Sequence, residues 1–181
     1  MSGIVEIIGE VVKEMEKGLT ITYPHGEVVE CPRLTYIFGN AQYVKDKLDE
    51  YSQSDDEVKF PLVVLFCPVK ESRNSSAYRS RVQLNLILAC SSDKEWSNEQ
   101  RLEYSFRNIL RPMYDRLLEV LKCMEDRFLI EYDGNIPHDY LENYSYGRYG
   151  AYTESGEEVS EPIDAINIRS MELIVKNHSC R

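Results

Sequence analysis

The longest helical pattern in the chain runs from Trp96 to Met124. Its apolar residues recur at intervals of three and four, the spacing that places them on one face of an α-helix. They are Leu102, Phe106, Ile109, Leu110, Met113, Leu117, Val120, Leu121 and Met124. Pro112 interrupts the pattern, and a proline inside a helix removes a hydrogen bond and costs about 3 kcal/mol. We therefore expect a kink, or two helices that meet, near Arg111.

Two further helices are predicted in the first third of the chain. Apolar residues from Ile4 to Met15 repeat the spacing of three and four, and Gly18 supplies a stop signal. Asn40 is a suitable N-cap for a helix that reaches about Glu50, because its side chain can accept hydrogen bonds from the free amides of the first turn. The chain thus begins with an amphipathic helix that needs a partner for its apolar face.

Three segments predict the main strands of a sheet. Residues 60–67 (FPLVVLFC) form an apolar run typical of a strand buried on both faces, and we expect it at the centre of the sheet. Residues 82–88 alternate with one apolar face. Residues 163–175 (IDAINIRSMELIV) close the chain, and their alternation changes phase near Ser170, where we expect a β-bulge. Shorter strands are predicted at 20–23, 28–29 and 128–132.

These elements predict one α+β domain spanning residues 1–181. In it, a mostly antiparallel sheet packs against the N-terminal helix and the long, proline-interrupted helix. Residues 70–81 are predicted to form a polar loop between two strands. Residues 134–162, rich in tyrosine, glycine and acidic side chains, are predicted to be a long irregular connector. Connectors of this length are usually functional or mobile.

The charge balance narrows the range of partners. The chain has 31 acidic and 21 basic residues, a formal charge of −10, and such a field repels a phosphate backbone. The acidity suits an ordinary soluble surface, and it equally suits a channel wall past which DNA slides without binding. No apolar run approaches the roughly 20 residues of a bilayer helix. Glutamates interrupt the apolar residues near the start, so no export signal is expected.

No catalytic, cofactor or metal motif is found. The five cysteines have no metal-ligand spacing and are predicted to be reduced thiols. The three histidines lack the spacing of four residues on a helix that holds zinc. The strongest enzyme hypothesis places His138, Asp139 and Tyr140 near a cysteine nucleophile, although adjacent loop residues seldom converge on one substrate atom. A small hydrolase with a noncontiguous site is therefore the alternative to a protein without catalysis.

Two groups of side chains are predicted to form interfaces, because arginine and tyrosine are the residue types that anchor them. The alternative for each group is a hydrated loop. The first group is Arg73, Tyr78, Arg79 and Arg81, and the second, inside the connector, is Tyr144, Tyr146 and Tyr149.

The order of these segments resembles small tail-terminator or head-tail joining (neck) proteins of long-tailed bacteriophages. The resemblance covers most of the chain: an N-terminal helix, the strands FPLVVLF and VQLNLILA, a tryptophan, the helix RNILRPMYDRLLEVLK, a tyrosine-rich region and the last strand. Its most suggestive pieces are the segment Ile109 to Tyr114 and the closing Asp164-Ala165-Ile166.

This resemblance implies a structural virion protein that performs no catalysis. Such proteins form rings of identical subunits, usually hexamers, end the growth of the tail tube and join the tail to the head. The implied partners are copies of the chain, the tail tube and neck or connector proteins, while DNA passes without specific binding. The implied location is the virion, after assembly in the host cytoplasm. Another head-to-tail adaptor is the alternative within this class.

Overall fold

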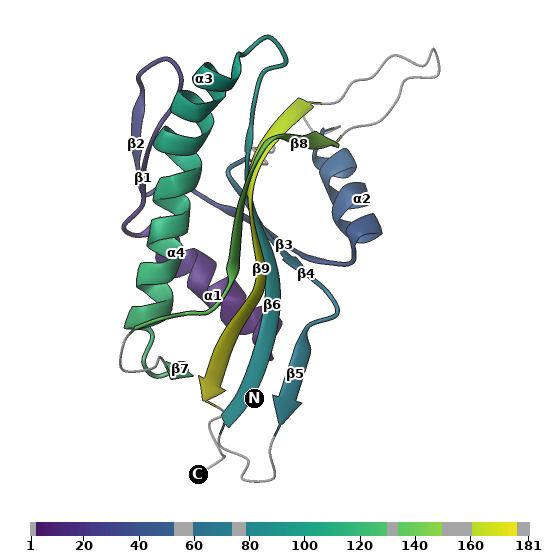
Figure 1. Cartoon of the computed structure of the whole chain (residues 1–181), viewed down its shortest axis with the longest axis vertical. Helices are drawn as coiled ribbons and strands as arrows, with labels where there is room; N and C mark the ends of the chain where they lie inside the picture. The colour runs from purple at the N-terminus through teal and green to yellow at the C-terminus, as the bar shows by residue number, and fades with distance from the viewer. Residues whose placement is uncertain (1–2, 53–59, 74–78, 130–133, 150–160, 177–181) are drawn as a thin grey trace.

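A computed structural model describes residues 3–52, 60–73, 79–129, 134–149 and 161–176. It contains helices and a curled, mostly antiparallel sheet, which confirms the α+β class (Figure 1). The elements are α1 (Ile4–Glu16), β1 (Thr20–Thr22), β2 (Val28–Glu30), β3 (Thr35–Gly39), α2 (Ala41–Ser52), β4 (Leu62–Phe66), β5 (Lys70–Arg73), β6 (Arg79–Ser91), α3 (Asn98–Arg101), the π-helix η1 (Leu102–Leu110), α4 (Arg111–Cys123), β7 (Phe128–Leu129), β8 (Asp139–Tyr149) and β9 (Glu161–Lys176).

The sheet is built around β6 and β9. Its strand order is β3-β4-β6-β9-β7, with β5 paired to β6 and β8 paired to β9. Only the β3–β4 pair is parallel among these pairings. The strand β4 is buried along most of its length, as predicted, but it lies one strand away from the centre that the sequence suggested. The two long central strands therefore carry most of the pairing.

The phase change near Ser170 is a β-bulge, which confirms that prediction. Between the pairs Leu84–Met171 and Leu86–Ile168, β9 advances by one residue more than β6. Ser170 has a φ of 52°, in the left-handed region, and its N–H donates to the Oδ1 of Asn85 at 3.0 Å. The extra residue returns the apolar side chains of the last strand to one face.

Helices cover the two faces of the sheet unequally. On one side, here called the helix face, α1, η1 and α4 bury a large apolar core with residues such as Leu65, Leu84 and Ile168. On the other side, the outer face, Val44 of α2 closes a small cluster that includes Ile87 and Ala165. Asn40 caps α2 as expected, because its Oδ1 accepts from the N–H of Tyr43 at 2.8 Å. Only part of the outer face is thus covered by a helix.

The long helix continues through Pro112 without a break. Figure 1 shows α3, η1 and α4 as one rod, in which the π-helical turns end at Leu110 and α geometry begins at Arg111. The N–H of Arg111 donates to the carbonyl of Phe106, five residues back. The missing N–H of Pro112 therefore lies where the helix changes type, so the expected irregularity near Arg111 is a change of helical geometry rather than two separate helices.

A buried ion pair fixes this helix to the sheet. The Nη1 of Arg101 lies 2.9 Å from the Oδ1 of Asp164, and their side chains are 6% and 0% exposed. The hydroxyls of Ser105 and Ser92 donate to the Oδ2 of Asp164 at 2.6 and 2.7 Å. A second arginine nitrogen donates to the carbonyl of Asp93. The charges of both groups are therefore matched by hydrogen bonds on several sides.

Three strands differ from the prediction. Residues 139–149 form β8, so the irregular connector predicted at 134–162 is wrong there, while 150–160 lie outside the described residues. The predicted loop at 70–81 instead supplies β5 and the start of β6, paired from Lys70 to Gln83. The strand β3 was not predicted. All three are short or polar, and none has a clear apolar alternation of its own. Hydrogen bonds to neighbouring strands hold them in the sheet instead.

The core assignment predicts that Leu65→Ala and Leu117→Ala each lower the free energy of unfolding by about 2 to 5 kcal/mol, because each leaves a cavity. Both leucines are at most 1% exposed. Urea denaturation measures the change. Val28→Ala is the control, because Val28 is 59% exposed and should change stability by less than about 0.5 kcal/mol. Similar small values at both leucines would contradict the assignment.

The ion pair predicts a comparable loss for Asp164→Ala, about 3 to 5 kcal/mol, because the variant leaves Arg101 charged and buried without its partner. The same denaturation experiment measures it. Asp126→Ala, at a side chain that is 71% exposed, removes an equal charge from the surface and serves as the control. A loss below about 1 kcal/mol for Asp164→Ala would contradict this prediction, because such a small value is typical of exposed surface ion pairs.

Candidate interaction surfaces

The structure divides the predicted arginine group between two faces. Arg73 lies opposite the buried Ser80 in the β5–β6 pairing, so both occupy the helix face, and Arg73 pairs with Glu71 at 3.0 Å. Arg79 and Arg81 alternate with Ser80, so they occupy the outer face and are exposed. Tyr78, the fourth predicted member, lies outside the described residues. The sequence could not predict this division without the register of the hairpin.

Arg79 and Arg81 belong to a larger basic surface that sequence reasoning missed. Lys70 lies opposite Gln83 and Lys176 lies opposite Arg79, so strand register brings four cations to the outer face at one end of the sheet. We call Lys70, Arg79, Arg81 and Lys176 the basic face. Figure 1 shows β5 and the adjacent ends of β6 and β9 extending beyond the helices. The exposed Glu172, opposite Gln83, lies on the same face, and the Nζ of Lys176 donates to the carbonyl of Glu125. The face is therefore basic by excess within a chain of charge −10.

Of the second predicted group, only Tyr144 has a described side chain. Its ring packs on Phe106 of η1 with centroids 4.3 Å apart, and it is 36% exposed. The backbones of Tyr146 and Tyr149 lie in β8, but their side chains lie outside the description. One side of the Tyr144 ring therefore packs inside the protein, and only the remaining, exposed surface of the ring can contact a partner.

Next to Tyr144, a polar cluster joins β8 to the long helix. The guanidinium of Arg111 donates to both carboxylate oxygens of Glu142, at 2.7 and 3.1 Å. The hydroxyls of Tyr140 and Tyr144 also donate to this carboxylate. The hydrogen bonds from Arg111 hold the pKa of Glu142 below its usual value, because they stabilise the charged form. Glu142 is thus the acceptor at the centre of the cluster.

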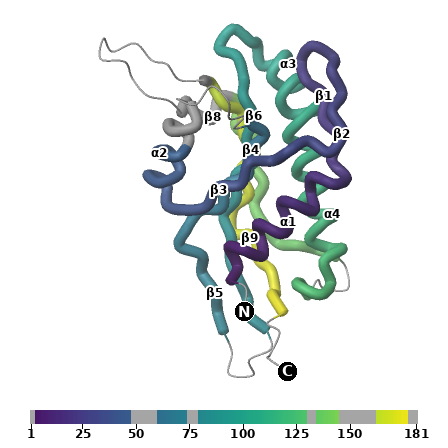
Figure 2. Tube along the Cα trace, turned by 180° about the vertical axis from the view of Figure 1, so that it is seen from behind, coloured from purple at the N-terminus to yellow at the C-terminus, as the bar shows by residue number. Residues whose placement is uncertain are grey.

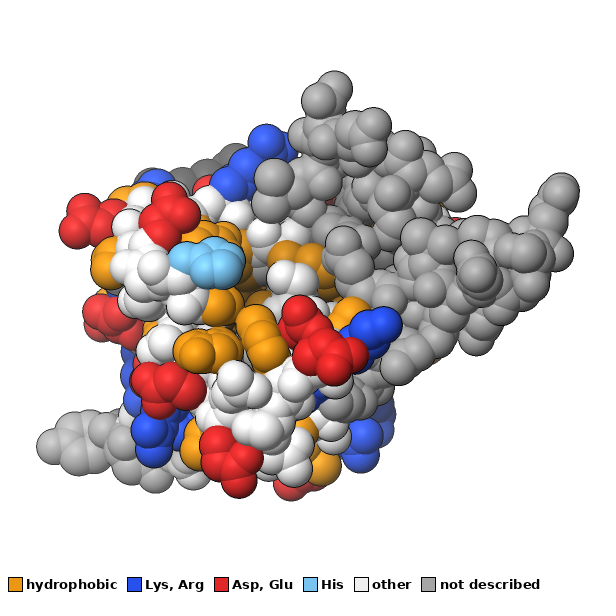
Figure 3. Space-filling model, turned by 90° about the horizontal axis from the view of Figure 1, so that it is seen from above, with side chains coloured by type: hydrophobic (Ala, Val, Ile, Leu, Met, Phe, Trp, Pro, Cys, Tyr) orange, Lys and Arg blue, Asp and Glu red, His pale blue; other side chains and the backbone are white. Residues whose placement is uncertain are grey.

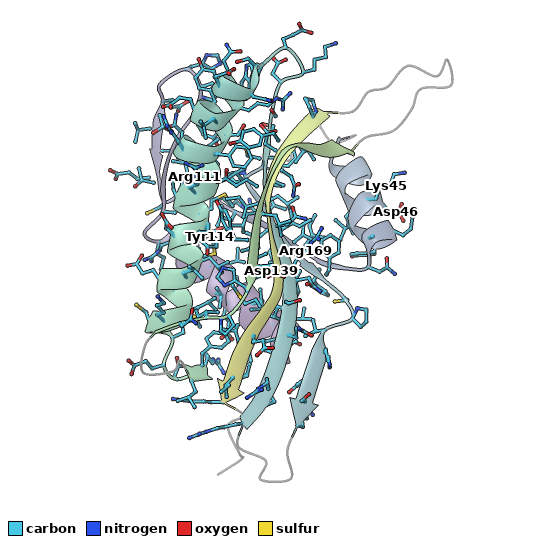
Figure 4. All side chains as sticks on the ribbon, in the orientation of Figure 1. Lys45, Asp46, Arg111, Tyr114, Asp139 and Arg169 are labelled. Atoms are coloured by element: carbon cyan, nitrogen blue, oxygen red, sulfur yellow. The ribbon has the colours of Figure 1, made fainter. Side chains whose placement is uncertain are left out.

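The residues of the enzyme hypothesis have the following contacts in the structure. The Nδ1–H of His138 donates to the carbonyl of Ile136 at 2.6 Å, so in the neutral ring Nε2 accepts from the hydroxyl of Tyr114, also at 2.6 Å. Asp139 instead lies opposite Arg169 in the β8–β9 pairing (Figure 4). Burial raises the pKa of the Cys90 thiol to about 12, which keeps this thiol neutral.

A groove runs between α1 and the edge strand β3. Apolar residues from both elements and from the segment before β3 line it, with glutamates and two basic residues among them. The main apolar contributors are Ile4, Val5, Leu34, Tyr36 and Phe38, and the charged ones are Glu6, Glu10, Lys13, Glu16, Arg33 and Glu71. Sequence reasoning missed this groove because β3 was not predicted. In Figure 2, α1 crosses diagonally from the side of β3 and β5 towards α4.

At the end of the molecule that carries α3, the acidic side chains are dispersed (Figure 3). Figure 3 looks down on the end of the molecule that carries α3, where acidic side chains are scattered among apolar and uncharged ones. Within the described ranges, no three histidine, cysteine, aspartate or glutamate side chains are grouped to hold a metal ion. Among the described helices, none is long and apolar enough to cross a membrane.

A scan against protein-family models gives no match. A search of curated proteins also finds no match at the significance required.

The cluster around Glu142 predicts a stability that depends on pH. The folded pKa of Glu142 lies below its unfolded value, so its contribution is complete above the unfolded value, about 4.3, and is lost as the pH falls through the folded value. The difference in unfolding free energy between the wild type and Glu142→Gln should therefore be constant from about pH 6 to 8 and shrink towards pH 3. Glu95→Gln, at an exposed position before α3, controls for general acid effects. A difference unchanged by acid would contradict the assignment.

Proposed function

We propose that the chain is a structural subunit of a bacteriophage virion, a tail terminator or head-tail connector that forms a ring with copies of itself. The order of its helices and strands supports this proposal through its resemblance to tail-terminator and neck proteins. The ring, a hexamer, ends the tail tube and joins it to neck or connector proteins. The subunit performs no catalysis, and it is assembled in the host cytoplasm into the virion.

The observation that carries the proposal is the basic face at a projecting end of an acidic chain. A closed ring of identical subunits needs a heterologous contact, in which one surface of a subunit meets a different surface of the next. A cationic surface on a subunit of charge −10 is complementary to much of the remaining surface of its copies. The same net charge lets DNA pass through the ring without specific binding.

The basic face provides the test. The double variant Arg79→Glu, Arg81→Glu should fold normally, because both side chains are exposed on the outer face, and it should impair particle assembly by placing like charges at the contact. Electron microscopy of particles assembled with the wild type, with the double variant and without the chain measures tail length and head attachment. The expected result is untailed or wrongly terminated particles in the last two cases.

The matched control is Lys45→Glu, Arg107→Glu. It makes the same change in net charge at exposed positions on α2 and η1, so assembly should proceed. If the double variant at Arg79 and Arg81 gave normal particles, the basic face would not be part of the contact between subunits. Normal tails and attached heads in the absence of the chain would overturn the proposed function.

A further inference from the structure

We draw no further inference here: the strongest candidate, the groove between α1 and the edge strand β3, is lined by apolar residues and by charges of both signs, and nothing in the described part of the structure shows what covers it.

Discussion

The buried pair of Arg101 and Asp164 joins the long helix to the last strand, 63 residues apart in the sequence. Two charges removed from water cost free energy unless hydrogen bonds satisfy them, and here two serine hydroxyls and a main-chain carbonyl complete the set. Such a pair tolerates few other geometries. It fixes the start of the long helix over the start of β9, and the packing of η1 and α4 on the helix face follows from that placement.

The strand β9 then organises the rest of the sheet. It pairs with β6, β7 and β8, and the bulge at Ser170 places Met171, Leu173 and Val175 on the same helix face as Ile166 and Ile168. β8 has almost no aliphatic residues of its own. It is held on one side by backbone pairing with β9 and on the other by contacts with the long helix, where Arg111 binds Glu142 and Phe106 packs on Tyr144.

This dependence explains which features the sequence could predict. Elements with an apolar period, such as α1, α4, β4 and β9, and even the bulge in β9, follow from side chains that alternate or repeat along the chain. The strands β5 and β8 are polar, and their pairing partners lie elsewhere in the sequence. The same limit applies to the sites: Arg73, Arg79 and Arg81 are close in sequence, but only strand register separates Arg73 from the other two and adds Lys70 and Lys176.

The fold also separates two different exposed surfaces. The basic face occupies the outer face, where the only described helix is α2, while the groove beside α1, with apolar residues and charges of both signs, lies on the helix face. A strand bound at β3 would extend the sheet at its edge, whereas a subunit docked on the basic face would contact side chains of strands that are already paired. The first contact needs backbone hydrogen bonds and the second needs charge. Added salt should therefore weaken the contact of the basic face more than a strand pairing, because screening acts on exposed charges and leaves backbone hydrogen bonds largely unchanged.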